Sequence, residues 1–342
     1  EQIDNYVKEC WEAIVETAVW AEKELPGVLE KVSPDIVCVD NVILFPAIKR
    51  YASENNKPWV RVISCSENEI PDPQIPPHLS GCGENDSECF SAYQNHFNEV
   101  IQPIHDRFNA FLAECGEAAY PVGEFFEASP HMNLLLYPEP VKFNRSTPLD
   151  PGQFQYLEGC VRDEEAYEVP QFKAHNDAPL LYVSFGSLGS GDTGLLRRLM
   201  DVVSTMPVRA LFNVGDYESE YDTVPDNVQI ASWYPQPSVI SQADAVIHHG
   251  GNNSFNECLY FGKPAIIMPY VWDGHDNAKR IAETGHGHHL HRNHWKPKEL
   301  RATIESMLSN QAMQERLAAT SAHMRSEHGP TKAAAILDQL LI

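Results

Sequence analysis

Apolar residues follow two different spacings in the first part of the chain. Within residues 2–23 they recur every three or four positions, which predicts an amphipathic helix. The runs 34–40 and 58–64 are almost continuously apolar, which is typical of strands buried on both faces of a parallel sheet. The segment 41–56 between them predicts a helix. This alternation indicates a parallel sheet with covering helices.

The regular pattern breaks in the middle of the chain. Residues 66–90 are dense in proline, glycine and acidic side chains, so we expect a long surface loop there. A helix at 91–115 and a strand at 131–138 follow. A polar segment without periodicity then separates this half from the next and predicts an interdomain linker.

A second alternating series fills the rest of the chain. The predicted strands are 179–187, 208–215, 227–233, 244–249, 264–269 and 286–291. The predicted helices are 194–206, 235–243, 253–262 and 276–285, followed by two more at the end of the chain. We therefore expect domains at 1–160 and 179–342 joined by a linker at 161–178, with the last helix a candidate to pack back on the first domain.

Length and charge narrow the possible functions. The chain has 342 residues, 43% of them hydrophobic, which is enough for two domains with substantial cores. Its net charge of −23 repels phosphate backbones and anionic lipids, so neither nucleic acid nor a membrane surface is an expected partner. No apolar run is long enough to span a bilayer, and no leader-like segment opens the sequence, so we expect a cytoplasmic protein.

The eight cysteines form no CxxC pair, and Cys38 lies within a strand-like run. This pattern predicts reduced, structural thiols in a reducing compartment. A disulfide between Cys82 and Cys89 within the loop is the alternative.

The segment HHGGNNSFNE (248–257) stands where a predicted strand ends and a helix begins. Gly250 and Gly251 allow a tight turn and a close approach of the backbone to a ligand, and Asn252 or Asn253 is a suitable N-cap. The start of a helix presents amide N–H groups and a positive dipole end, which together bind anions without lysine. A pyrophosphate suits such a site, whereas an ordinary strand–turn–helix corner is the structural alternative.

Polar groups follow other strands of the same series. The segment SFGSLGSG (184–191) is a second corner rich in glycine and serine, and WYPQ (233–236) offers an indole and an amide to a base. Glu257 stands one helical turn beyond the first corner, and WDGHDNA (272–278) follows the next strand. Parallel strands place such groups at one edge of a sheet, which is where ligands bind.

These motifs together resemble a known family. The succession W-x-P-Q, H-G-G-x-N-S-x-x-E and G-K-P-x-x-x-x-P-x-x-x-D-x-x-x-N-A, within 233–278, is similar to the donor-binding signature of family-1 UDP-glycosyltransferases. The loop IPDPQIPPHLSG and the run LYVSFGSLGS resemble the bacterial-type branch that some arthropods, mites among them, also carry. The resemblance implies an α/β GT-B fold, in which two Rossmann-like domains with parallel sheets face each other across a cleft.

The resemblance also implies roles for the residues that match the signature. Trp233 would stack on uracil, Gln236 would bond the base or ribose, and Glu257 would hold the ribose hydroxyls. The diphosphate would be held at the glycine corner, and Asp273 would bind hexose hydroxyls. The residues implied at the diphosphate are Ser187, His249, Gly251, Asn253 and Ser254. The structural alternatives are a core position for Trp233, a satisfied strand-end histidine for His249 and a helix cap for Asp273.

The chain departs from the family pattern at two places. Gly274 stands where many relatives have a glutamine that contacts the sugar, which leaves the sugar open. Residues 1–33 contain nothing similar to the glycine-rich turn that carries the catalytic histidine, so we expect an N-terminal portion outside this sequence and an incomplete first domain. Asp40 matches the aspartate that orients that histidine, and an N-cap for the helix 41–56 is its alternative.

The activity implied by the resemblance is inverting transfer of a hexose, glucose in the first instance, from a UDP-sugar to a hydroxyl of a small lipophilic acceptor. Detoxification or secondary metabolism would be its setting, and no cofactor or metal is required. The acceptor pocket would be lined by aromatic residues of the first domain, which otherwise form its core: Phe90, Tyr93, Phe97, Phe108, Phe125 and Phe126. A non-catalytic UDP-sugar-binding subunit and a UDP-sugar epimerase on the same scaffold are the alternatives.

The histidine-rich run HGHHLHRNH (286–294) suggests a metal site at first reading. Strand alternation places His286 and His288 on one face and His289 and His291 on the other, so four ligands do not converge. We therefore expect a pH-sensitive surface strand without metal.

Overall fold

The computed structural model describes residues 3–40, 43 and 45–341, so positions 41, 42 and 44 of one predicted helix lie outside the described residues. The chain divides into two compact units, residues 1–158 with 328–342, and residues 159–327. The segment 160–178, all of which is described, contains neither helix nor strand. The last helix is assigned to the first unit.

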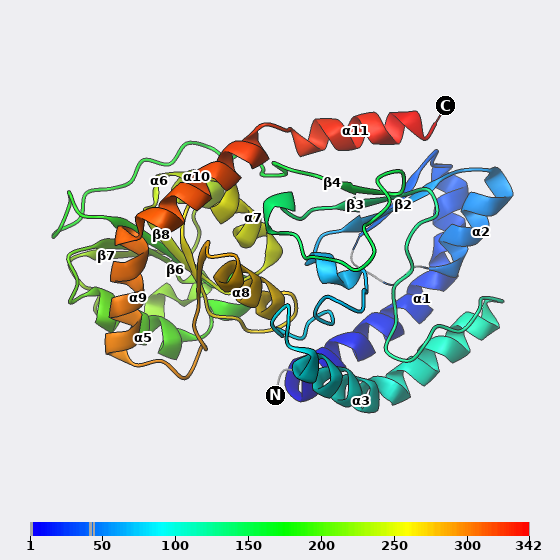
Figure 1. The fold of residues 1–342 in the computed structure, drawn as a ribbon, viewed down its shortest axis with the longest axis horizontal. Helices are drawn as coiled ribbons and strands as arrows, with labels where there is room; N and C mark the ends of the chain where they lie inside the picture. The colour runs from blue at the N-terminus through cyan, green and yellow to red at the C-terminus, as the bar shows by residue number, and fades with distance from the viewer. Residues whose placement is uncertain (1–2, 41–42, 44, 342) are drawn as a thin grey trace. The chain divides into compact units, whose positions relative to one another are not determined.

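The first unit is built on a four-stranded parallel sheet in the order β1-β2-β3-β4 (Figure 1). Its strands are β1 (Val37–Asp40), β2 (Trp59–Ile63), β3 (Met132–Leu135) and β4 (Phe154–Tyr156). Its α-helices are α1 (Lys8–Val32), α2 (Pro46–Asn55), α3 (Ser87–Glu114) and α11 (Gly329–Gln339), and a π-helical turn at Ile3–Val7 precedes α1. The sequence pattern missed β4, because three residues are too few for a periodicity to show.

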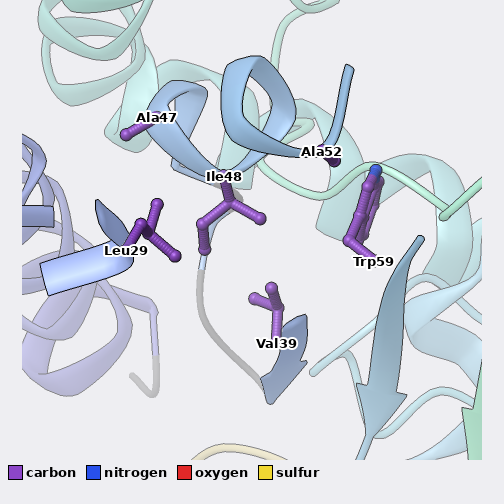
Figure 2. Close-up of a cluster of buried hydrophobic side chains, with 6 residues drawn as sticks. All are labelled: Leu29, Val39, Ala47, Ile48, Ala52 and Trp59. Atoms are coloured by element: carbon purple, nitrogen blue, oxygen red, sulfur yellow. The ribbon is translucent and has the colours of Figure 1, made fainter. Parts of the chain in front are cut away.

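A cluster of buried apolar side chains joins two helices of the first unit to its sheet (Figure 2). Leu29 of α1 and Val39 of β1 belong to it, together with three residues of α2 and Trp59 of β2. All six side chains are at most 7% exposed. This core holds β1 in place and with it the carboxyl end of the strand, at which Asp40 stands.

The second unit is built on a six-stranded sheet in the order β10-β9-β8-β5-β6-β7, again with parallel pairs throughout (Figure 1). Its strands are β5 (Leu180–Ser184), β6 (Arg209–Asn213), β7 (Val228–Ala231), β8 (Ala245–His248), β9 (Ala265–Ile267) and β10 (Gly287–His289). The chain starts in the middle with β5, runs outward to β7, and returns to the other side of β5 as β8. This is the strand order of a doubly wound dinucleotide-binding sheet, whose switch point lies between β5 and β8.

Helices connect these strands as the alternation predicted. They are α4 (Gly186–Gly189), α5 (Thr193–Val203), α6 (Gln236–Gln242), α7 (Asn252–Tyr260), α8 (Gly274–Glu283), α9 (Pro297–Ser309) and α10 (Gln311–Arg325). The expectation of two helices after the last strand was wrong, because α9, α10 and α11 follow it. None of the described helices is long and apolar enough to cross a membrane.

The expectation of a surface loop at 66–90 was also wrong in part. Glu67 is fully buried at the start of this segment, and Ile75 and Leu79 are at most 3% exposed. The Glu67 carboxylate accepts hydrogen bonds from the Phe143 amide (2.9 Å) and the Tyr156 hydroxyl (2.8 Å). Such partners are distant in sequence, so local composition could not reveal that the loop is anchored in the core.

The expectation that all cysteines are reduced was wrong as well. The structure joins Cys82 to Cys89 by a disulfide, at a Cα–Cα distance of 5.8 Å. Cys82 lies within the 66–90 segment, before α3, and Cys89 lies in the first turn of α3. The remaining cysteines carry free thiols, of which Cys65 and Cys258 are buried.

Removing the Glu67 carboxylate tests whether this loop is held by a buried polar network. Glu67→Ala leaves the Arg145 guanidinium, which lies 3.3 Å from Glu67 Oε1 and whose side chain is 5% exposed, without its counter-charge. We expect a loss of about 3–5 kcal/mol in the free energy of unfolding, measured with chemical denaturant.

The matched control removes an exposed ion pair of the same unit. Asp35 is 68% exposed and bonds Lys57, so Asp35→Ala should cost less than about 1 kcal/mol. Equal losses for the two variants would show that the buried network does not hold the loop.

Candidate functional site

The candidate donor site lies at the switch point of the second sheet. β5 leads into the short helix α4 through Gly186, whose φ is +66°, and β8 leads into α7 through Gly250 and Gly251. Both corners follow the carboxyl ends of adjacent parallel strands. Glycine-rich turns at this edge of a doubly wound sheet form a ligand crevice.

Gly250 is required at its corner by two independent constraints. Its φ is +92°, which strains any residue with a side chain. A Cβ atom at Gly250 would also meet the Gly274 carbonyl oxygen and Ile267 Cγ2 at 2.7 Å. The backbones of the two corners after β8 and β9 are therefore in direct contact.

Gly274, at the corner after β9, is also too close to the opposite backbone for a side chain. A Cβ atom there would lie 2.7 Å from the His249 carbonyl oxygen. A glutamine at position 274 would require the two corners to move apart. The departure from the family pattern at this position therefore has a packing reason.

A buried histidine stabilises the turn from below. The Gly250 amide donates to His248 Nδ1 at 3.1 Å, which leaves the ring proton on Nε2. His248 is fully buried, and burial lowers its pKa to about 3. The ring is thus neutral, and it acts as a structural acceptor rather than as a charge.

The predicted asparagine cap was wrong. Gly251 is the N-cap residue of α7 and has no side-chain cap bond, so Asn252 is already the first helical residue. Its amide donates to Asp273 Oδ2 at 3.0 Å, and the Asn277 side-chain amide donates to the same oxygen at 3.4 Å. Asp273 thus caps the start of α7 from the corner that follows β9. The sequence analysis gave a helix cap as the structural alternative for Asp273, without naming the helix. The two glycines complete the turn before either asparagine, which explains the displaced cap.

Three of the predicted site residues form one hydrogen-bonded cluster. The Gln236 amide donates to Glu257 Oε2 (2.6 Å) and to Ser254 Oγ (3.0 Å). Glu257 and Ser254 are buried, at 3% and 7% exposure. Burial raises the pKa of the Glu257 carboxyl, against the opposing effects of Gln236 and Arg162. The cluster joins the first residue of α6 to the first two turns of α7.

Other predicted residues lie at the surface of this unit. Trp233 is 56% exposed, so its alternative as a core residue is wrong. Ser187 and Asn253 are exposed, and Gly251 and His249 are half-buried. A Cβ atom at Gly186 would lie 3.0 Å from His249 Cε1, so the imidazole packs directly on the first corner. Burial lowers the pKa of His249, which keeps that ring neutral as well.

Asp40 belongs to the first unit, whereas the nine predicted donor-site residues belong to the second. It is exposed at the end of β1. Its alternative as an N-cap was wrong, because α2 begins at Pro46 and its N-cap residue is Phe45. Asp40 therefore does not cap α2.

Sequence reasoning missed two contributors to the Glu257 cluster. Arg162 Nη1 lies 3.6 Å from Glu257 Oε1, although Arg162 stands in the predicted linker. The Tyr182 hydroxyl donates to Gln236 Oε1 at 3.3 Å from within β5. No local pattern marks either residue, because both act on partners far away in the sequence.

The first unit contains a cavity of about 790 Å³. Five of the six aromatic residues predicted for an acceptor pocket line it: Phe90, Tyr93, Phe97, Phe125 and Phe126. Phe108 does not, since it is a fully buried core residue. Trp11 of α1 and the loop residues Glu69, Ile75 and His78 complete much of the wall.

The histidine-rich segment has ordinary partners in the structure. His286 is buried, and its ring bonds the hydroxyls of Thr284 (2.9 Å) and Thr320 (2.8 Å). The rings of His291 and His294 stack at 4.1 Å. The expectation of an exposed strand here was therefore wrong for His286, whose hydrogen bonds hold it in the interior.

Comparison with known proteins places this geometry in context. Residues 197–340 match the profile of the erythromycin biosynthesis protein CIII-like C-terminal domain. The full length of this chain aligns with 84% of the glycotransferase of kitacinnamycin, with a TM-score of 0.77 and 21% identity. Similarly, 98% of this chain aligns with 80% of the calicheamicin glycosyltransferase CalG4, with a TM-score of 0.74 and 21% identity. The fold is GT-B.

Curated relatives of this GT-B chain are glycosyltransferases by name. The oleandomycin glycosyltransferase of Streptomyces antibioticus is 25% identical over 263 residues, 72% of this chain and 60% of that protein. The NDP-glycosyltransferase YjiC of Bacillus subtilis is 25% identical over 313 residues, 90% of this chain and 73% of that protein. The chain spans only 39% of another Bacillus subtilis relative, the uncharacterized UDP-glucosyltransferase YojK, to which it is 23% identical over 157 residues, 45% of this chain. The arthropod branch stays a prediction.

Substituting Gly250 tests the contact between the two corners. Gly250→Ala adds a Cβ atom at φ +92° and 2.7 Å from the Gly274 carbonyl oxygen, so we expect a loss of about 1–3 kcal/mol in the free energy of unfolding. Denaturant titration of the purified variant measures it.

Gly194→Ala in α5 is the control, because its Cβ atom would meet nothing closer than 3.8 Å and no positive φ is involved. That variant should be neutral or more stable by about 0.4–1 kcal/mol. A Gly250→Ala variant as stable as the Gly194→Ala variant would contradict the packing described here.

Proposed function

We propose that this protein transfers a hexose, glucose in the first instance, from a UDP-sugar to a hydroxyl group of a small lipophilic acceptor. The observation that carries the proposal is the buried cluster of Gln236, Ser254 and Glu257, which brings an amide and a carboxylate together between α6 and α7. Trp233, which precedes Gln236 by three residues and is 56% exposed, would add a stacking platform. The glycosyltransferase names of the relatives support the same activity.

The nucleotide end of the donor would occupy this cluster. Trp233 would stack on uracil, and Glu257 would accept hydrogen bonds from the ribose hydroxyls. Gln236 would then exchange part of its bond to Glu257 for one to the base or ribose. A carboxylate held in a buried site by a neighbouring amide is preorganised for such a bond.

The diphosphate would lie against the start of α7. The amides of the first helical turn and the dipole supply positive potential, with Ser187, Asn253 and Ser254 as hydroxyl and amide donors. His249, held neutral by burial, would donate a hydrogen bond rather than contribute a charge. The leaving UDP would be stabilised there without lysine or metal.

The sugar would lie near Asp273, a residue that is 8% exposed. Gly274 offers no side chain to the hexose, so Asp273 would be the main acidic contact at this corner. In the first unit, Asp40 would stabilise the imidazolium of a histidine base of the kind that the resemblance implies. That base would deprotonate the acceptor hydroxyl for attack on the anomeric carbon with inversion.

Binding of UDP in the absence of any acceptor tests the donor site directly. UDP should raise the Tm by linkage, and Trp233→Ala and Glu257→Gln should each weaken UDP binding about tenfold or more. dTDP should bind less tightly than UDP, because it lacks the 2′-hydroxyl proposed to reach Glu257. Calorimetric titration gives the affinities.

Trp20→Ala is the matched control, because Trp20 is 66% exposed and lies in α1 of the first unit. It should leave the UDP affinity unchanged. Absence of UDP binding by the intact chain would overturn the donor assignment. Tighter binding of dTDP would replace UDP by a deoxynucleotide donor. Two similar solved structures, those of VinC and SpnG, are complexes with thymidine diphosphate.

The pH dependence of donor binding reports on Glu257. Because burial raises the pKa of its carboxyl, Glu257 takes up a proton at a higher pH than an exposed glutamate does. The proton removes an acceptor for the ribose hydroxyls, so affinity should fall as the pH is lowered from neutrality through the raised pKa. Calorimetric titration with UDP-glucose suits the test, since its diphosphate does not titrate in this range.

Glu257→Gln should bind weakly and without this pH dependence. Glu305→Gln, which changes an exposed glutamate of α9, should follow the wild-type profile. A wild-type affinity that is flat down to about pH 5, below which ordinary glutamates titrate, would contradict the proposed role.

A further inference from the structure

The cavity of the first unit is walled by rings on one side and by the 66–90 loop on the other. α3 contributes Phe90, Tyr93 and Phe97, while Trp11 and Phe125 stack at 4.1 Å. Its volume of about 790 Å³ suits a drug-sized molecule. Such walls recognise an apolar body but carry little information about polar groups on it.

Glu69 is a buried acidic residue in this wall. The residue is 5% exposed and lines the cavity. Its Oε1 accepts from Arg61 Nη2 at 2.5 Å, and Arg61 itself is 2% exposed, with its guanidinium 4.4 Å from the centre of the Phe126 ring. Oε2 is buried and has no hydrogen-bond partner among the described residues. A buried carboxylate oxygen without a partner is costly, so a donor from a bound molecule would be strongly favoured there.

The remaining polar groups of the wall disfavour anions. The lining residues, all of which are described, include no lysine or arginine. Burial and the nearby Arg61 charge lower the pKa of His78 to about 3, so its ring is neutral. Asp72 and Glu124 add further acidic groups to the lining. A carboxylate or phosphate on the ligand would therefore meet repulsion from these acidic groups, while the Arg61 cation is already paired with Glu69.

The position of Glu69 relates it to the proposed chemistry. The Asp40 charge acts on Glu69 and adds to the rise in its pKa that burial causes, while Arg61 opposes that rise. Both carboxylates belong to the first unit. A molecule bonded to Glu69 would therefore lie in the same unit as the aspartate proposed to serve the base.

We propose that Glu69 determines acceptor specificity: the cavity takes a neutral or cationic aromatic compound whose hydroxyl or ammonium group donates a hydrogen bond to Glu69 Oε2, and it rejects carboxylates. Arg61 acts as a positioning residue that fixes the orientation of the carboxylate. This assignment rests on the proposed function for the identity of the cavity as the acceptor site. The ligand contacts themselves are independent of the donor.

Binding of matched naphthalenes to the chain without nucleotide tests the proposal. The probes are 2-naphthol, 2-methoxynaphthalene, 2-naphthylmethylamine and 2-naphthoate, measured by calorimetry or equilibrium dialysis. The wild type should bind the naphthol and the amine about tenfold more tightly than the ether, as expected for a hydrogen bond to a charged group, and the naphthoate least. Glu69→Gln should keep part of the naphthol preference and lose the preference for the amine.

A double variant, Arg61→Met with Glu69→Leu, removes the acceptor without leaving a buried unpaired charge. It should bind naphthol and ether equally, and the ratio is measured within one folded protein whose melting curve is recorded. Glu124→Gln, which removes an exposed carboxylate of the same wall, should leave the naphthol-to-ether ratio unchanged.

Equal binding of naphthol and ether by the wild type, preference for the naphthoate, or no binding of any probe would overturn the proposal. So would ratios that Glu69→Gln leaves unaltered. Failure of UDP binding would remove the proposed function but leave these ratios as they are, so the two failures are distinguishable.

Discussion

The contact between the Gly250 and Gly274 backbones is the constraint on which the candidate donor site depends. It brings the corner after β8 against the corner after β9, closer than any side chain would allow. At this separation Asp273 accepts a hydrogen bond from the first amide of α7. The start of α7, the His249 backbone and the Asp273 cap are therefore packed directly against one another.

This constraint also explains how a strongly acidic chain can offer a site to a diphosphate. Backbone amides cannot be lost by mutation of a side chain, and they require no desolvated cation. The buried groups nearby are kept neutral or paired: burial lowers the pKa of both histidines, and Glu257 shares its oxygens with Gln236 and Arg162. The proposed diphosphate site would thus take its positive potential from backbone amides within a protein of net charge −23.

The parts that could be predicted from sequence are those encoded locally. The apolar runs of β2, β5 and β8 and the helices between them follow directly from periodicity, and the glycine corners follow from turn chemistry. The expectation that β1 is buried on both faces was wrong, because β1 is an edge strand and Cys38 is exposed. The cluster of Gln236, Ser254 and Glu257 was foreseeable because parallel strands end at one edge. The anchored loop around Glu67, the disulfide, the role of Asp273 as a cap and the reach of Arg162 were not. Each depends on a partner far away in the sequence, and spacing alone contains no information about it.

Arg162 gives the segment before the second sheet a connection to the ligand crevice. This stretch has no ladder or helix of its own, yet one of its cations approaches the oxygen opposite the one that Gln236 binds. A molecule that binds the Glu257 oxygens would compete with Arg162 for them. Its binding would therefore be coupled to the mobility of residues 160–178. Donor binding at Glu257, as proposed, would then change the restraint that Arg162 places on residues 160–178.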